Sequence, residues 1–253
     1  MSALNEFSLR EALIDTGAIR ENAAILAARA GERPLLADVA GDGYGHGAVE
    51  SARAALDGGA VWLGVSTLAD AAELRRSGIR APILASYPVD PRGAEDAGVT
   101  VGSDPDVELA GAALYGLVSD PELRAAMRVS ARVVGTKTIE RDEGVSYGYT
   151  YRATTRTSLA LVALGYADGL DRPASNLGTL WLAGKPRLIA GRVAMNAHVL
   201  ELGSDSAAIG DEAVLFGDAN AGEPSAVDWA AHLDKDAAEV VSVLGAKLPR
   251  RYL

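Results

Sequence analysis

Apolar positions in the first half of the chain switch between a helical and a strand period. Ile19, Ala23, Leu26 and Ala30 follow one another at spacings typical of one face of an amphipathic helix. Shorter apolar runs lie between the helical stretches, and glycines often stand where a run ends. The pattern predicts helices over residues 19–30, 49–56 and 68–77, with Thr67 as the cap of the third, and strands over residues 35–39, 61–65, 82–85 and 99–101.

The second half of the chain has a different pattern. In the first half, strands alternate with helices of about ten residues, which is typical of βαβ units with a parallel sheet. Beyond residue 126 the apolar runs are short, and glycine-containing turns divide them. Strand-like runs lie at residues 129–134, 159–164, 186–193 and 213–216. This half therefore predicts a mainly antiparallel β domain.

These patterns divide the chain into two domains, residues 1–120 and residues 121–253. The predicted fold class is α/β plus β, with a partial parallel (β/α) barrel followed by the antiparallel β domain. A complete (β/α)₈ barrel needs roughly 250 residues and at least about 200. The first domain can supply only part of one, and an incomplete barrel leaves two sheet edges unpaired. We therefore expect another element or a second chain to cover those edges.

A glycine-rich turn follows the first apolar strand. Residues 42–47 read Asp-Gly-Tyr-Gly-His-Gly, and this segment resembles the alanine racemase family, whose first barrel strand ends in Lys-Ala-Asp-Ala-Tyr-Gly-His-Gly. The resemblance implies the fold of these pyridoxal phosphate (PLP) enzymes, a barrel followed by a β domain, with on the order of a hundred barrel residues missing before residue 114. Further segments that resemble the family lie at residues 14–22, 65–79, 114–116, 144–148, 165–169, 191–196, 210–217 and 248–252.

The resemblance also assigns roles to individual residues. The family lysine holds PLP and acts as one of two bases, but Ala40 stands at its position, and a methyl group can neither form an imine nor accept a proton. Tyr147 matches the other base, the catalytic tyrosine, and Leu109 replaces an arginine that contacts the pyridine nitrogen. The remaining assignments are Tyr44, His46, Gly111 and Tyr166 for the cofactor, and Met195 and Asn196 for the substrate, with Asn196 replacing an aspartate.

Each of these residues also has a structural interpretation. The glycines of residues 43–47 would supply positive φ in a strand-to-helix turn, and His46 would satisfy the local backbone. Tyr147 lies in an alternating run, residues 146–151, that favours a strand at a domain junction or a dimer interface. Tyr166 and Asp168 favour a turn. The four lysines of the chain that could replace the missing one all lie in the β domain: Lys137, Lys185, Lys235 and Lys247.

Composition and charge narrow the classes of partner. The net charge of −10 and the pI of about 4.8 disfavour nucleic acid and anionic membranes. No apolar run approaches the length of a membrane span. Cysteine is absent and the three histidines lack metal-ligand spacing, so we expect no disulfide and no metal. We predict a cytoplasmic protein.

Two functions follow from these observations. The first is an alanine-racemase-like protein that is catalytically inactive, binds no cofactor and serves as a binding or subunit-interaction protein. Its expected partner is a second copy of itself, or an intact racemase in a hetero-oligomer. The alternative is a PLP-dependent racemase of weak or altered activity that interconverts L- and D-alanine. A third interpretation, a plain internal deletion of an ordinary racemase, does not explain Ala40, which lies outside the missing stretch.

Overall fold

The chain folds into two compact units, which we describe separately. The computed structural model describes residues 8–87, 93–94, 98–102 and 106–253. The parallel unit comprises Ile14–Met127 with Tyr252–Leu253, and the antiparallel unit comprises Met1–Leu13 with Arg128–Arg251.

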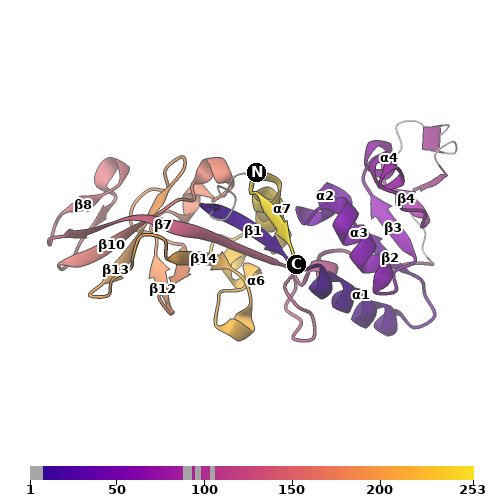
Figure 1. Ribbon diagram of the computed structural model, residues 1–253, viewed down its shortest axis with the longest axis horizontal. Helices are drawn as coiled ribbons and strands as arrows, with labels where there is room; N and C mark the ends of the chain where they lie inside the picture. The colour runs from indigo at the N-terminus through magenta and orange to yellow at the C-terminus, as the bar shows by residue number, and fades with distance from the viewer. Residues whose placement is uncertain (1–7, 88–92, 95–97, 103–105) are drawn as a thin grey trace, which may run out of the picture. The chain divides into compact units, whose positions relative to one another are not determined.

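The parallel unit is built on a five-stranded parallel sheet with the order β5-β4-β3-β2-β6 (Figure 1). The parallel sheet is therefore confirmed. The strand β6 was not predicted, because three residues with an exposed leucine in the middle give no periodic signal. The elements are β2 (Leu35–Asp38), β3 (Trp62–Val65), β4 (Ile83–Ala85), β5 (Val99–Val101), β6 (Glu108–Ala110), α1 (Thr16–Ala30), α2 (Ala40–Tyr44), α3 (Ala48–Asp57), α4 (Leu68–Arg76) and the 3₁₀ turn η2 (Ala112–Tyr115).

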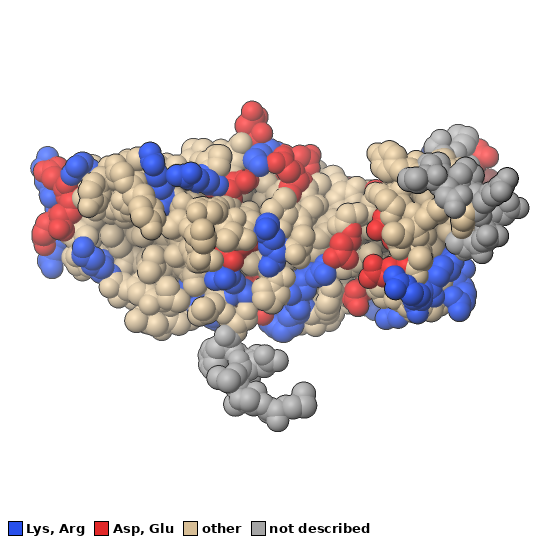
Figure 2. Space-filling view, turned by 90° about the horizontal axis from the view of Figure 1, so that it is seen from above, with Lys and Arg blue, Asp and Glu red and all other residues tan. Residues whose placement is uncertain are grey.

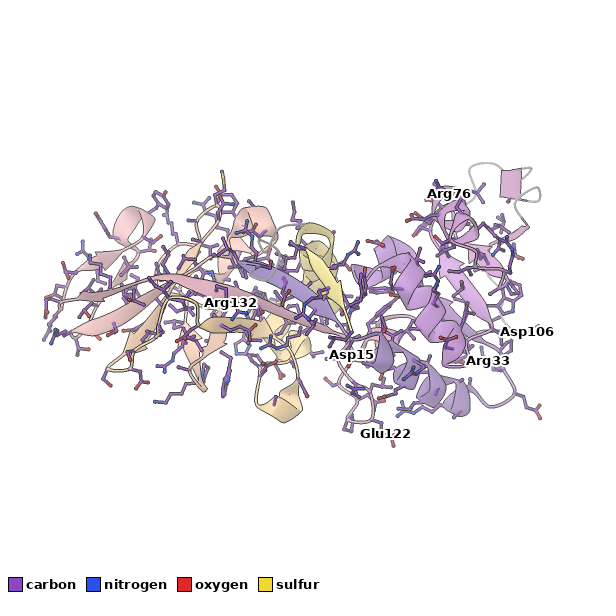
Figure 3. The ribbon with its side chains drawn as sticks, in the orientation of Figure 1. Asp15, Arg33, Arg76, Asp106, Glu122 and Arg132 are labelled. Atoms are coloured by element: carbon purple, nitrogen blue, oxygen red, sulfur yellow. The ribbon has the colours of Figure 1, made fainter. Side chains whose placement is uncertain are left out.

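Two helices of this unit, α1 and α4, begin at polar caps. Asp15 precedes α1 and accepts a hydrogen bond from the Ala18 N–H at 3.0 Å (Figure 3). Thr67 and Asp70 form a capping box at the start of α4, and the sequence pattern predicted Thr67 as this cap. Each cap satisfies backbone N–H groups that would otherwise lack a partner within the helix.

The two faces of the parallel sheet differ in burial. Ala37, Leu63 and Ile83 lie side by side in register and are fully buried. One residue earlier along the strands, Leu36, Trp62 and Leu109 lie side by side on the opposite face. There Leu109, on the edge strand β6, is 63% exposed. An exposed leucine on an edge strand leaves apolar surface and unpaired backbone groups in contact with water. Within the described residues, β5 and β6 have one strand partner each.

The antiparallel unit is an eight-stranded sheet with a separate two-stranded hairpin. Its thirteen-residue strand β7 pairs antiparallel with both β14 and β10 and runs the length of the sheet (Figure 1). The elements are β1 (Arg10–Ile14), β7 (Met127–Ile139), β10 (Thr157–Val162), β11 (Thr179–Leu182), β12 (Lys185–Leu188), β13 (His198–Gly203), β14 (Glu212–Phe216), β15 (Arg250–Tyr252), the hairpin β8 (Gly144–Val145) and β9 (Tyr151–Arg152), α6 (Ala226–Ala231), α7 (Ala237–Lys247), and the 3₁₀ turns η3 (Tyr147–Tyr149), η4 (Tyr166–Asp168), η5 (Arg172–Ala174) and η6 (Ala219–Ala221).

The predicted antiparallel domain is confirmed, with two corrections to its elements. The expected strand over residues 186–193 ends at Leu188, where the backbone changes partner: Ile189 forms an isolated bridge with Leu200, and Gly191 then turns the chain with a φ of 83°. The expected strand over residues 146–151 is a 3₁₀ turn between β8 and β9. Its backbone turns because Ser146, Gly148 and Tyr149 all have positive φ.

Charged side chains of both signs are interspersed on the surface (Figure 2). Within the antiparallel unit, Arg128 donates to Glu223 at 2.7 Å and to Glu212 at 2.8 Å, which holds the start of β7 to β14 and the following loop. None of the helices in the described part of the chain is long and apolar enough to cross a membrane.

Candidate functional site

Ala40 lies at the carboxyl end of β2, where the first residue of α2 follows the strand. This is the edge at which the loops of parallel α/β sheets gather their binding groups. The Ala40 N–H donates to the Asp38 carboxylate, to Oδ1 at 3.0 Å. The position that the sequence assigned to a cofactor lysine is therefore at the expected edge of the sheet, and it carries a methyl group.

The residues after Ala40 form a left-handed turn. Gly41, Asp42, Gly43 and Tyr44 have φ values of 60°, 57°, 63° and 53°. Such a conformation costs roughly 1–2 kcal/mol for each residue with a side chain, and glycine avoids that cost. The expectation that glycines supply positive φ here is confirmed. Asp42 and Tyr44, which carry side chains, adopt the same left-handed conformation.

Tyr44 is held within this turn. Its hydroxyl donates to the second carboxylate oxygen of Asp38, Oδ2, at 3.1 Å. A Cβ placed on Gly111 would lie 3.2 Å from the Tyr44 hydroxyl oxygen, so the two residues are in close proximity. The fold therefore brings together Ala40, Tyr44 and Gly111, three of the positions singled out in the sequence.

His46 is fully buried in the same segment. Its Nδ1 lies 3.0 Å from the Gly43 carbonyl oxygen, and its ring stacks on Tyr115 at 4.5 Å between centroids. The Tyr115 hydroxyl donates to the Asp38 carbonyl at 2.9 Å, and burial raises the pKa of this phenol well above its ordinary value. These contacts match the structural interpretation of His46, which predicted bonding to the local backbone.

The candidate residues of the antiparallel unit occupy exposed turns. Tyr147 lies in η3, and its side chain is 72% exposed. In the described part of the chain its hydroxyl makes no hydrogen bond. The Ser146 hydroxyl donates to the Arg192 carbonyl at 2.7 Å, and a Cβ on Gly148 would lie 3.6 Å from the Arg192 guanidinium carbon. The tyrosine turn therefore packs against the start of the segment 192–196.

Tyr166 and Met195 are joined by their backbones. The Tyr166 N–H donates to the Ala194 carbonyl at 3.0 Å, and the next residue's N–H donates to the Met195 carbonyl at 2.9 Å. The two side chains are 43% and 56% exposed, and Asn196 beside them is also exposed. Asp168 closes the 3₁₀ turn η4 through the Gly165 N–H at 2.9 Å, so the predicted turn is confirmed. Tyr147, Tyr166, Met195 and Asn196 all border one segment of the antiparallel unit.

Sequence reasoning missed Asp38, Tyr115 and Arg192. Asp38 had a visible signal, since it is the only charged residue in the otherwise apolar run of residues 35–39. Tyr115 and Arg192 lie in segments that resemble the family, residues 114–116 and 191–196, but their contacts could not be predicted because they join segments far apart in the chain. In the described residues, no group of three or more His, Cys, Asp or Glu side chains is arranged to hold a metal ion.

Comparisons with known proteins match both units. The family model for the alanine racemase N-terminal domain matches residues 14–114, and the model for the C-terminal domain matches residues 126–252. The chain is 33% identical to an alanine racemase from Thermobifida fusca over 367 aligned residues, which cover 97% of this chain and 98% of the relative.

Two solved structures have the same fold. An alanine racemase from the D-cycloserine producer Streptomyces lavendulae has a TM-score of 0.89 at 30% identity and covers 98% of both chains. An alanine racemase from Streptomyces coelicolor has a TM-score of 0.90 at 28% identity and covers 96% of this chain and 98% of its own. With two family models along the chain and a relative aligned over nearly all of it, this protein belongs to the alanine racemase family.

Proposed function

We propose that this chain does not catalyse the PLP reaction of its family and acts instead as a binding or subunit-interaction protein. The observation that carries the proposal is Ala40, whose methyl group stands at the lysine position on the carboxyl end of β2. The four lysines of the chain all lie at residue 137 or later. The parallel unit therefore contains no lysine that could anchor the cofactor.

The other residues at this end of β2 also fit PLP poorly. PLP would supply an electron sink for carbanion chemistry, and it would need an amine for its aldehyde and hydrogen-bond donors or cationic groups for its doubly charged phosphate. The structure offers instead the Asp38 carboxylate within hydrogen-bonding distance of both Ala40 and Tyr44. The Leu109 side chain lies where the resemblance assigns an arginine for the pyridine nitrogen. We propose that the protein binds no PLP.

The lengths of the aligned sequences support a deletion within the barrel. The alignment to the Thermobifida fusca relative extends over 367 residues, which is 114 more than the 253 residues of this chain. We propose that the missing residues belong between the βα unit that ends near residue 79 and Leu114. The chain would then consist of a partial barrel, residues 1–120, and a family β domain, residues 121–253.

An absorption spectrum tests the proposal directly. The purified protein is mixed with PLP, dialysed, and scanned in the visible range before and after addition of L-alanine. We expect no retained absorption band above that of a control protein of equal lysine content. A retained band that shifts with L-alanine would show that a lysine reaches the site and would overturn the proposal.

The alternative function is a weak alanine racemase, and the names of the relatives favour it. Free PLP racemises amino acids slowly, so traces of activity do not by themselves show a catalytic site. The comparison of the wild type with Tyr147→Phe separates the cases, because the family mechanism uses this phenol as a base. A D-alanine yield that falls at least a hundredfold in the variant would support the alternative, and an equal yield would exclude the family mechanism.

We further propose an oligomer, either a dimer of this chain or a complex with an intact racemase. The support is the pair of edge strands β5 and β6, together with the exposed Leu109 side chain on β6. Light scattering behind a sizing column measures the mass of the protein alone and of its mixture with a family racemase. A monomer in both samples would count against both assemblies.

A further inference from the structure

The Asp38 carboxylate joins the two positions on which cofactor binding would depend. Oδ1 accepts from the Ala40 N–H at 3.0 Å, and Oδ2 accepts from the Tyr44 hydroxyl at 3.1 Å. The backbone of Asp38 is fixed as well, because its carbonyl accepts from the buried Tyr115 hydroxyl at 2.9 Å. One anionic group is thus held in place between the lysine position and the tyrosine.

The charge of Asp38 is not balanced by a nearby cation. Within the described part of the chain, no lysine, arginine or histidine nitrogen lies within 4 Å of its carboxylate oxygens. Burial raises the pKa of the Tyr115 phenol most, and the Asp38 carboxylate raises it further. The surroundings of Ala40 therefore favour cations over anions.

From these contacts we propose that Asp38 selects against anions at the end of β2, so that restoring the lysine at position 40 would not by itself restore PLP binding. This inference rests on the proposed function, since it concerns the same cofactor position. Two effects combine. A phosphate bound by the Tyr44 hydroxyl would approach the carboxylate that already accepts from that hydroxyl, and a lysine at position 40 would pair with Asp38 as an ammonium.

The second effect follows from covalent geometry. Because Oδ1 lies 3.0 Å from the Ala40 nitrogen, the Cβ of residue 40 is only a few bonds from the carboxylate, and a lysine stem is long enough to turn back to it. An ammonium held by a carboxylate keeps its proton. Only the unprotonated amine attacks an aldehyde, so the ion pair would lower the reactive fraction of the lysine.

Four proteins test the inference: the wild type, Asp38→Asn, Ala40→Lys, and the double variant. Asparagine keeps one oxygen that accepts from the Ala40 N–H, and its NH₂ group can donate to the Tyr44 hydroxyl oxygen, so it removes the charge and retains the shape. After incubation with PLP and dialysis, we expect the double variant to bind PLP at least tenfold more tightly than Ala40→Lys. Equal binding by these two variants would overturn the inference.

A second measurement needs no cofactor. The wild-type chain has only four lysines, so the side chain introduced by Ala40→Lys is readily assigned in the NMR spectrum of lysine-labelled protein. We expect the pKa of the introduced ammonium to fall by about one unit or more when Asp38 becomes asparagine. An unchanged pKa would show that the two groups do not interact, whatever the outcome of the PLP experiment.

A third measurement uses proteins that all carry Ala40→Lys, so that an amine is present for the aldehyde. PLP and pyridoxal differ in the phosphate, so the ratio of their affinities reports on anion exclusion. We expect Asp38→Asn to shift this ratio toward PLP by about tenfold. The matched control is Asp42→Asn, at a carboxylate that accepts from the Ala48 N–H at 2.8 Å, and we expect it to shift the ratio less than threefold. Equal shifts would assign the effect to net charge and overturn a specific role for Asp38. If the wild type itself retains PLP, the proposed function fails, but this ratio still tests Asp38.

Discussion

In the parallel unit, the side chains that the resemblance assigns to the cofactor are hydrogen-bonded or packed within the fold, whereas in the antiparallel unit the side chains that it assigns to catalysis and substrate face solvent. Tyr44 donates to Asp38, and His46 is buried against Tyr115. Tyr147 and Met195 are more than half exposed. Both units belong to one family fold, yet among these assigned positions the large exposed side chains lie in the antiparallel unit.

This contrast indicates where function would remain after the loss of the lysine. A hydrogen-bonded, buried cluster stabilises the fold but must break internal contacts before it can bind a ligand. Exposed aromatic side chains on a fixed turn can bury area against a partner with little loss of rotamer freedom. The contrast therefore favours the antiparallel unit over the end of β2 as the carrier of the interaction role.

Replacing Gly43 by alanine tests how rigid the buried cluster is, and it has the largest effect that we expect. The new Cβ would lie 2.7 Å from the Ser51 Oγ, and the residue has a φ of 63°. Backbone strain and overpacking together predict a loss of about 3 kcal/mol in the free energy of unfolding. Hydrogen exchange read by mass spectrometry reports this loss for peptides of the parallel unit separately.

Gly41→Ala is the matched control for this change. Gly41 has nearly the same φ, 60°, but nothing lies within 4 Å of an added Cβ. The backbone term alone predicts a loss of about 1 kcal/mol. If both alanines cost the same, the packing of the turn against Ser51 is looser than described, and the contrast between the units weakens.

The antiparallel unit has its own buried polar group, which makes its stability depend on pH. His198 on β13 is fully buried, and burial lowers its pKa from 6.5 to about 4, although its Nδ1 lies 2.7 Å from the Leu164 carbonyl. Between pH 6.5 and 4 the unfolded chain binds a proton that the folded chain does not. Stability is therefore present above pH 6.5 and is lost as the pH falls toward 4, by about 3 kcal/mol in total.

Urea unfolding at pH 7, 5.5 and 4 measures this loss. The comparison with His198→Gln isolates the histidine, because carboxylates titrate in both proteins over the acidic part of the range. The variant is expected to lose less stability between pH 7 and pH 5.5. If the free energy of unfolding changes equally in the two proteins between pH 7 and pH 5.5, then His198 takes up a proton as readily in the folded chain as in the unfolded chain.

The regular elements could be predicted from sequence because their signals are local. The apolar period of residues 19–30 and the cap at Thr67 predict α1 and α4 without reference to the rest of the chain. The strand β6 could not be predicted, since its three residues become a strand only by pairing with β2. The turn at Tyr147 was wrongly predicted as a strand, because alternation alone does not reveal a backbone with positive φ.

The candidate site was likewise predictable from sequence only in part. Ala40 and Tyr44 could be located from a sequence motif, and the fold places them together. The role of Asp38 could not be predicted, because it depends on a carboxylate reaching two donors across a left-handed turn. Contacts of this kind depend on the dihedral angles of several residues at once, which no single residue type encodes.

Tyr115→Phe is expected to have an intermediate effect. The hydroxyl of this buried side chain donates to the Asp38 carbonyl, and its removal leaves that acceptor without this bond. Loss of a buried hydrogen bond predicts a decrease of about 1–2 kcal/mol in the free energy of unfolding. The local readout is faster hydrogen exchange in peptides that contain β2, and unchanged exchange there would mean that this hydroxyl does not hold the cluster together.

Tyr147→Phe is expected to have the smallest effect on stability, below about 0.5 kcal/mol, because an exposed hydroxyl without a partner in the described part of the chain contributes little to folding. Tyr147→Ala removes the ring as well, and if the antiparallel unit carries the interaction, this change should weaken the oligomer at least tenfold while the monomer stays folded. Sedimentation of the wild type and both variants over a range of concentrations measures this. An oligomer that tolerates Tyr147→Ala but dissociates in Leu109→Ser would place the interaction on the parallel unit and reverse the contrast drawn between the two.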